Sequence, residues 1–298
     1  MRQALSPSSA TRIQLADGRW HFQHGPIDLI IGAEGDSRAI SNAMDRAWQR
    51  FQHLLPELVT ELRILRLPVD CGESLAGPVA RRMAGACAPF APLFITPMAA
   101  VAGAVADEII EYFRVPGIAK AYANNGGDIA LHLTPGTSFR VGLCANSEDK
   151  PWKQGALDGA FEVHASPSIR GIATSGWRGR SFSLGIADAV TVLARTAAQA
   201  DAAATMIANA VNIESPAIVR RPASELKDDT DLGDRLVTVD VGPLTPGEVA
   251  SALGCGERAA QGMMTDALIT AAVMVLQGAA VSVGSLRPGE RPYMELKI

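Results

Sequence analysis

Three oxygen-bearing side chains are spaced four residues apart in the segment "ADAAATMIAN", namely Asp201, Thr205 and Asn209. On a helix this spacing places them on one face, over about 12 Å of helix axis. Carboxylate and hydroxyl oxygens are ligands that Mg²⁺ accepts, so Asp201 followed by Thr205 one turn later is a workable partial metal site. A solvated polar stripe on an amphipathic helix explains the same spacing, and the residues alone favour that simpler interpretation.

The run "NNGGDIALHL", which starts at residue 124, places unusual turn residues at the entrance of an alternating apolar strand. An Asn-Gly pair is sufficient to supply the positive φ angles of a two-residue hairpin turn. Here Asn125 and Gly126 are followed by a second glycine, Gly127, and by a carboxylate, Asp128. A hairpin alone therefore leaves the second glycine and the acid unexplained.

A second candidate segment is "GIATSGWRGRSFSLGIADAVTV", which starts at residue 171. Glycine-rich backbone beside Arg178 and Arg180 can hold a phosphate group. A Ser/Thr turn that closes two strands explains the segment equally well, and Asp188 is either a turn residue or an acid of the site. The segment does not fit the G-x-S-x-G pattern of a nucleophile elbow. The candidate ligand-binding residues of this segment are Thr174, Ser175, Gly176 and Asp188.

The placement of the histidines and cysteines argues against two common kinds of site. No histidine lies beyond His164, which weakens any Ser-His-Asp arrangement, and His132 and His164 fall on strand patterns that favour a structural role. The cysteines contain no C-x-x-C pair, so neither a disulfide framework nor a zinc site is expected. We expect four reduced thiols, at Cys71, Cys87, Cys144 and Cys255.

The overall composition limits the classes of protein to which the chain can belong. A net charge of -4 gives no basic surface for phosphate backbones, so nucleic acid is not an expected partner. The first residues lack the apolar core of a signal peptide, and no run of about 18 uncharged apolar residues occurs, so we expect a cytoplasmic protein with no membrane association. Charged residues make up only 19% of the chain, and alanine and glycine are abundant, which predicts close packing of backbone against backbone.

The N-terminal half predicts a hairpin followed by helices. Apolar residues alternate on both sides of an Asp-Gly pair, which predicts a hairpin over about 11–31. A spacing of three and four predicts a helix over 36–55, and Pro56 should start a second short helix. The segment 96–113 should be a helix capped by Thr96, and its small residues favour a central buried position.

The middle of the chain predicts short strands that turn residues separate closely. Strands linked so tightly must be largely antiparallel, because a parallel crossover needs a dozen or more residues. Together with the flanking helices this predicts one α+β domain over 1–298, with an antiparallel sheet backed by helices. The expected strands are 120–124, 128–133, 139–143, 161–164 and 189–194. A helix over 199–212 and a C-terminal region of strand and helices over 234–298, with helices at 245–253 and 257–276, complete the prediction.

Five pieces of the sequence occur in an order that resembles a known superfamily: "PMAAVAGAVADEI", "NNGGDIAL", "ATSG", "GIADAVTV" and "ADAAATMIAN". They resemble the ApbE-like superfamily, whose best-known members are FAD:protein FMN transferases, and most closely its compact branch, uncharacterised protein family 0280. The likeness covers a motif core over about 90–212. It implies an ApbE-like, T-fold-related α+β architecture.

The resemblance also implies a site. In the transferases the Gly-Gly-Asp-Ile turn lines the flavin nucleotide pocket, and an Asp and a Thr spaced by four hold Mg²⁺ near the pyrophosphate. Carried over, Gly126, Gly127 and Asp128 would contact FAD, FMN or another nucleotide-like ligand. Asp201 and Thr205 would be the catalytic and metal-binding residues. An FMN phosphate would then pass to a Thr hydroxyl of an acceptor protein.

One difference from the transferases argues against FMN transfer but leaves ligand binding open. Transferases of this kind carry a His-Ile-x-Asp-Pro segment, whereas "SFSLGIADAV" contains neither His nor Pro. Three functions therefore stay open. They are Mg²⁺-assisted group transfer or hydrolysis, flavin or small-molecule binding without catalysis, and a metal-independent enzyme that acts on a small metabolite through Ser175 or Thr174. A homo-oligomer is compatible with each of them.

Overall fold

The computed structural model describes residues 9–143, 159–165 and 168–284. Nine strands form one main sheet, in which all neighbouring strands are antiparallel. The α+β class and the largely antiparallel sheet are thereby confirmed, whereas Cys144 lies outside the described residues. In spatial order the strands are β1 (Thr11–Gln14), β2 (Trp20–His24), β3 (Ile27–Gly35), β4 (Ile118–Asn125), β5 (Asp128–Leu133), β8 (Gly171–Ser175), β9 (Ala189–Ala194), β12 (Ala271–Leu276) and β13 (Ala279–Gly284).

The main sheet contains the same topology twice. The first half consists of strands β2 and β3, a set of helices, and strands β4 and β5. The second half has the same order, with β8 and β9, further helices, and β12 and β13. No internal repeat is visible in the sequence itself. The helices are α1 (Ser37–Thr60), α2 (Leu62–Leu65), α3 (Pro78–Cys87) and α4 (Val101–Ile110) in the first half, and α5 (Ala197–Ala210), α6 (Ala223–Leu226) and α7 (Pro246–Thr265) in the second.

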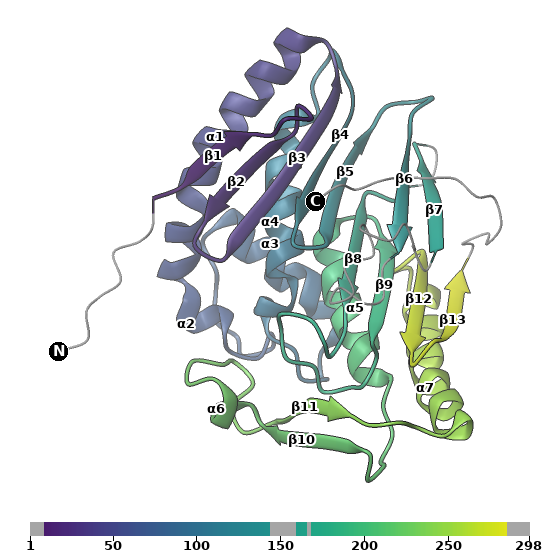
Figure 1. Cartoon of the computed structure of the whole chain (residues 1–298). Coiled ribbons are helices and arrows are strands. Elements are labelled where there is room, and N and C mark those ends of the chain that lie inside the picture. The colour runs from purple at the N-terminus through teal and green to yellow at the C-terminus, as the bar shows by residue number, and fades with distance from the viewer. Residues whose placement is uncertain (1–8, 144–158, 166–167, 285–298) are drawn as a thin grey trace.

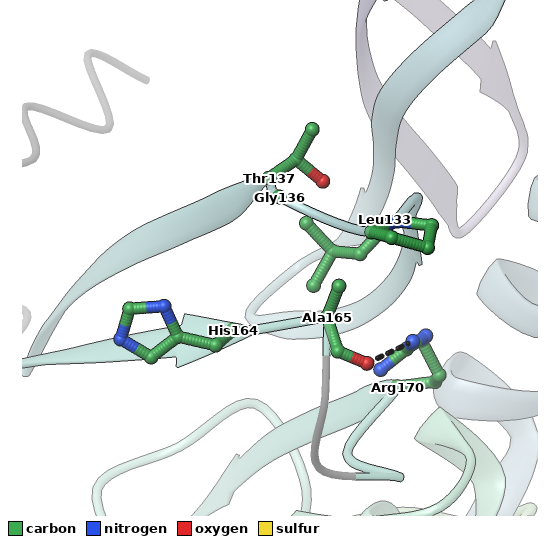
Figure 2. A pocket seen from close by; sticks show the side chains of 7 residues that line it. Leu133, Gly136, Thr137, His164, Ala165 and Arg170 are labelled. Atoms are coloured by element: carbon green, nitrogen blue, oxygen red, sulfur yellow. Dashed lines mark hydrogen bonds between the residues drawn. The ribbon is translucent and has the colours of Figure 1, made fainter.

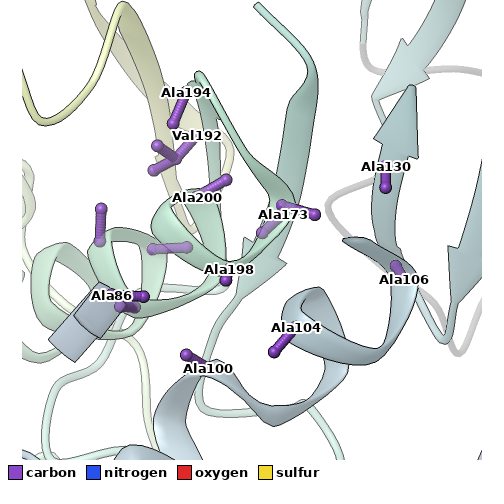
Figure 3. Close-up of a cluster of buried hydrophobic side chains, with 14 of the residues drawn as sticks. Ala86, Ala100, Ala104, Ala106, Ala130, Ala173, Val192, Ala194, Ala198 and Ala200 are labelled. Atoms are coloured by element: carbon purple, nitrogen blue, oxygen red, sulfur yellow. The ribbon is translucent and has the colours of Figure 1, made fainter. Parts of the chain in front are cut away.

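The helices lie on one side of the main sheet (Figure 1), and α4 and α5 occupy its centre. Alanines from both helices and from the strands beneath them fill this core, as Figure 3 shows for Ala104, Ala198 and Ala173. A Cβ added to Gly103 would overlap the carbonyl group of Ala197, so the two helix backbones are in direct contact. The predicted central helix of small residues is confirmed.

The opposite face of the sheet is covered in part by a separate hairpin of β6 (Ser138–Leu143) and β7 (Gly159–His164). Its side chains Phe139 and Val163 are buried with Tyr122 and Leu131 of the sheet in a second apolar cluster. A further hairpin, β10 (Ile218–Pro222) and β11 (Leu236–Val241), is inserted between α5 and α7. Among the described residues, no helix is both long and apolar enough to cross a membrane.

Two helix boundaries were predicted wrongly. Pro56 does not start a new helix, because α1 runs through it to Thr60 and the buried side chains Leu54 and Leu58 continue the apolar face on both sides. Thr96 does not cap the next helix: a 3₁₀ turn, Pro97–Ala100, precedes α4, and the Thr96 hydroxyl donates instead to the Asp231 carboxylate.

The C-terminal region also differs from the prediction. One helix, α7, spans the Gly254–Gly256 segment, and Gly256 packs against Val211. The residues from 271 onward form the β12–β13 hairpin instead of a helix, with its turn at Gln277 and Gly278, where φ is +45° and +81°. The last two strands of the sheet were therefore missed.

Candidate functional site

The two central residues of the β4–β5 turn are Gly126 and Gly127, because Asn125 pairs with Asp128 across it. The second glycine, which the sequence prediction left unexplained, is therefore part of the turn itself. Gly126 has φ +66° and Gly127 has φ +115°. The Gly127 N–H donates to Oδ1 of Asn124 over 2.8 Å, which closes the turn. A Cβ at Gly127 would have no atom within 4 Å, so this glycine faces open space. The outer face of the turn is therefore accessible to a ligand.

Asn125 connects this turn to two other elements. Its buried side chain donates from Nδ2 to the Ala102 carbonyl oxygen over 3.2 Å, and its Oδ1 accepts from the Asp28 N–H over 3.3 Å. The amide thus ties the turn to the start of α4 and to β3. Both ends of the amide have protein partners, so Asn125 acts on the site by holding the turn in place.

Asp128 is buried at the first position of β5. Its Oδ1 accepts a hydrogen bond from the Thr174 N–H over 3.3 Å, which links the double-glycine turn to the Thr-Ser-Gly segment on β8. Burial raises the pKa of Asp128 to about 7, although this hydrogen bond and the Arg180 charge oppose the rise. An ionised Asp128 is therefore costly unless a cation approaches it.

Asp201 lies on α5 and faces the same region. Its Oδ2 accepts a hydrogen bond from the Gly103 N–H at the start of α4 over 3.0 Å. Burial, followed by the negative charge of Asp128, raises the pKa of Asp201 well above its usual range. Asn125 of the β4–β5 turn and Asp201 of α5 bond to the consecutive residues Ala102 and Gly103, which places the turn and α5 next to each other at the start of α4.

The polar stripe of α5 does not continue as one set of ligands. Thr205 is half-buried one turn beyond Asp201. Asn209 is used elsewhere, because its Oδ1 accepts from the Leu184 N–H over 2.9 Å. The interpretation of the stripe as merely solvated is thus wrong for Asp201 and Asn209, which both have protein partners.

The Thr-Ser-Gly segment and Asp188 organise the loop between β8 and β9. The Thr174 hydroxyl is 2.9 Å from that of Thr191, and a Cβ at Gly176 would overlap the Asp188 carbonyl oxygen. The Asp188 carboxylate accepts from the Gln277 N–H over 2.5 Å and from Nε1 of Trp177 over 3.3 Å. In the described structure Asp188 fastens the loop to the β12–β13 turn, and a contact of Asp188 with ligand stays a prediction.

A family model described as "AbpE bacteria" matches residues 12–283. The chain belongs to this family. The resemblance to the ApbE-like superfamily and to uncharacterised protein family 0280 is thereby confirmed, since similar curated proteins are named UPF0280. One from Methanothrix thermoacetophila is 40% identical over 146 residues, which are 49% of this chain and 57% of that protein. One from Methanopyrus kandleri is 39% identical over 167 residues, 55% of this chain and 61% of that protein. The chain thus spans little more than half the length of these relatives.

Two solved structures are also similar to this AbpE family member. The ApbE protein of Thermotoga maritima is 12% identical, with a TM-score of 0.49, and the likeness covers 91% of this chain and 96% of that one. The flavinyl transferase ApbE of Pseudomonas stutzeri, in its apo form, is 12% identical with a TM-score of 0.41, over 94% of this chain and 96% of that one.

In this member of the AbpE family, three of the predicted segments meet. Asp128 accepts a hydrogen bond from the Thr174 N–H, and Asn125 and Asp201 bond to the neighbouring residues Ala102 and Gly103. Arg180 is a further member of the site: a Cβ at Gly126 would overlap its guanidinium group. Sequence analysis noted Arg180 only as one of two arginines in a glycine-rich segment, and nothing in the sequence showed which of the two reaches the turn.

A cavity of about 550 Å³ lies at the other end of β5 (Figure 2). Leu133, Pro135 and Ala165 line it, and Arg170 donates from Nη2 to the Ala165 carbonyl oxygen over 2.9 Å. His164 also borders this cavity, while His132 lies on β5 with its Nε2 3.2 Å from the Ile118 carbonyl oxygen. The cavity contains none of the predicted site residues, so the predicted site and this hollow are distinct places.

Proposed function

We propose that this AbpE family protein binds a flavin nucleotide, or a related nucleotide, where the β4–β5 turn meets the β8–β9 loop. We further propose that a divalent cation held by its carboxylates assists transfer or hydrolysis of the phosphate-bearing ligand. Family membership supports the flavin-related part of this proposal. The reaction itself is inferred from the chemistry of the site.

One observation carries the proposal: the β4–β5 turn and α5 both bond to the start of α4, through Ala102 and Gly103, and each brings an acid there. Burial raises the pKa of Asp128 and of Asp201, and the negative charge of Asp128 raises that of Asp201 further. Folding does not gather two largely buried like charges without cost, because each disfavours the charged form of the other. A divalent cation would remove that cost and restore both carboxylates to their ionised form. Strongly perturbed acids of this kind are candidate functional residues.

The donor set fits a hard cation such as Mg²⁺. Asp128 and Asp201 supply carboxylate oxygens and Thr205 supplies a hydroxyl one helical turn away, while water and ligand oxygens usually complete such a shell. Among the residues that the structure describes, no group of three His, Cys, Asp or Glu side chains could hold a metal alone. The cation would therefore depend on the phosphate-bearing ligand, whose oxygens it would neutralise when bound.

The remaining residues would bind and orient the ligand. Gly127 leaves the outer face of the turn open to a planar ring. Asn125 holds that turn against α4, and the Thr174 N–H orients Asp128. These contacts fix the position of the site's first acid before any ligand arrives, which lowers the entropic cost of binding.

Ligand affinity with and without Mg²⁺ tests this function. Binding of FMN, FAD and ADP should tighten when Mg²⁺ replaces EDTA, and Asp201→Asn should lose most of that gain. Asp228→Asn is the matched control, because Asp228 is an exposed acid in a loop that follows α6, outside the proposed site. Equal binding at every Mg²⁺ concentration by the wild type and Asp201→Asn would remove the cation from the proposal.

Product analysis distinguishes the reactions. Incubation with FAD and Mg²⁺ should release AMP if the diphosphate is cleaved. Covalent flavin fluorescence on a Thr-containing acceptor would then assign FMN transfer, and free FMN would assign hydrolysis. Flavin binding with neither product would assign a carrier protein instead of an enzyme.

A further inference from the structure

Arg180 lies in the loop between β8 and β9, and its guanidinium group rests against the backbone of the β4–β5 turn. A Cβ at Gly126 would overlap Nη2 and the central carbon of that guanidinium, so a side chain there would displace Arg180 from its position. The side chain is exposed, and within the described part of the chain it makes no hydrogen bond or ion pair. Its charge nevertheless opposes the effect of burial on Asp128.

Arg178 shows how different the position of Arg180 is. Two residues earlier in the same loop, Arg178 has Nε 3.4 Å from the Asp188 carboxylate, and its guanidinium stacks on Trp177 with 4.7 Å to the ring centroid. Arg178 is thus fastened within its own loop. Arg180 instead crosses to the β4–β5 turn, where its guanidinium lies against Gly126, two residues before Asp128 in the chain.

The donors of Arg180 are available to a ligand at the β4–β5 turn. The side chain is exposed and its guanidinium lies against Gly126, the first glycine of that turn. The planar guanidinium group matches phosphate geometry and forms strong charge-assisted hydrogen bonds.

We propose that Arg180 binds the phosphate of the nucleotide ligand at the β4–β5 turn. This inference rests on the proposed function, since it names the residue that recognises the phosphate at the same site. Phosphate recognition is then assigned to one exposed side chain beside the double-glycine turn.

Two ligand pairs that differ in their phosphates test the proposal: FMN with riboflavin, and ADP with adenosine. Affinities are measured in Mg²⁺ and in EDTA for the wild type, Arg180→Met, Arg180→Lys and the control Arg178→Met. Because a hydrogen bond to a charged group is worth about 1.5–3 kcal/mol, Arg180→Met should weaken FMN or ADP binding in Mg²⁺ about ten- to hundredfold. Riboflavin and adenosine should bind unchanged, and Arg180→Lys should fall between. Arg178→Met should bind as the wild type does.

Equal binding of FMN or ADP by Arg180→Met and the wild type would overturn the phosphate role, as would an equal loss in Arg178→Met. If the wild type binds riboflavin as tightly as FMN, the proposal of flavin binding holds, but the proposal that Arg180 recognises the phosphate is wrong. If it binds none of the four ligands, both proposals fall. Thermal melting of each variant confirms that it is folded.

Discussion

Asp107 on α4 and Asp201 on α5 cap one another's helices. The buried Asp107 carboxylate accepts from the N–H groups of Ala197 and Ala198 over 3.0 and 2.9 Å, and Asp201 accepts from the Gly103 N–H over 3.0 Å. In α4, Asp107 lies four residues after Gly103, whose N–H is capped, and in α5, Asp201 lies four residues after Ala197. The reciprocal contact prevents the two helices from sliding along each other. It thereby sets the position of Asp201 relative to the sheet.

Removal of the Asp107 cap should destabilise the protein. Asp107→Ala leaves two buried N–H groups of α5 without their acceptor, and we expect a loss of about 2 kcal/mol in the free energy of unfolding. Thr196→Ala is the matched variant, because Thr196 caps the same helix by accepting from the Gln199 N–H, and should cost about 1 kcal/mol. Urea unfolding measures both. A cost for Asp107→Ala no larger than that for Thr196→Ala would show that the reciprocal contact adds nothing.

Stability should fall as the pH rises when divalent cations are absent. Burial raises the pKa of Asp128 from 3.8 to about 7, so the folded state binds this proton more tightly than the unfolded chain does. The resulting stabilisation is complete below pH 3.8 and is lost as the pH rises towards 7. Burial raises the pKa of Asp107 to about 6, which contributes to the lower part of this range. Urea unfolding in EDTA should show the decline, and Asp128→Asn should flatten it between pH 6 and 7; a rise over that interval in the wild type would contradict the assignment.

Substitution of Gly126 should affect ligand binding as well as stability. A methyl group at Gly126 meets a positive φ of +66° and displaces Arg180, whereas Gly136, with φ +86°, has open space around it. Both alanine variants should lose about 1 kcal/mol or more from backbone strain. Only Gly126→Ala should also weaken binding of FMN in Mg²⁺, by a factor similar to that for Arg180→Met. Calorimetric titration compares the two, and equal FMN affinities would separate the turn from the site.

Two helical glycines should respond in opposite directions to the same change. Gly103→Ala places a methyl group against the Ala197 backbone, which cannot move without separating α4 from α5, and should cost about 1–3 kcal/mol. Gly85 lies inside α3 with nothing within 4 Å of an added Cβ, so Gly85→Ala should stabilise by about 0.5–1 kcal/mol through helix propensity. Thermal unfolding gives both signs, and stabilisation by Gly103→Ala would contradict the close contact of the helices.

Local sequence signals were sufficient for the elements whose residues interact mainly with their own neighbours in the chain. The N-terminal hairpin, the five middle strands and the α+β class followed from turn residues and short spacing. Pro56 misled because packing of Leu58 outweighs the local cost of a proline inside α1. The apolar run at 271–276 was assigned to a helix because a short buried strand has no alternation to distinguish it.

The site was predictable only in part for a related reason. An excess of turn residues singled out the glycines and Asp128. The spacing of Asp201 alone favoured a solvated stripe, and only the family resemblance assigned Asp201 to a site. Asp107 and Arg180 act on residues 90 and 54 positions away, as the pairs Asp107–Ala197 and Gly126–Arg180 show. No periodicity in one sequence reports such distant pairs. The single domain over 1–298 and the contribution of Thr205 stay predictions.

The two topological halves of the sheet meet at β5 and β8, where only Ile129–Ile172 and Ala130–Gly171 are paired. Asp128 belongs to the first half, whereas Thr174, Arg180 and Asp201 belong to the second. Each half on its own therefore carries one acid and an incomplete set of contacts. Ligand binding at this place would require that the two halves are docked, so ligand affinity would serve as a direct measure of assembly across the seam.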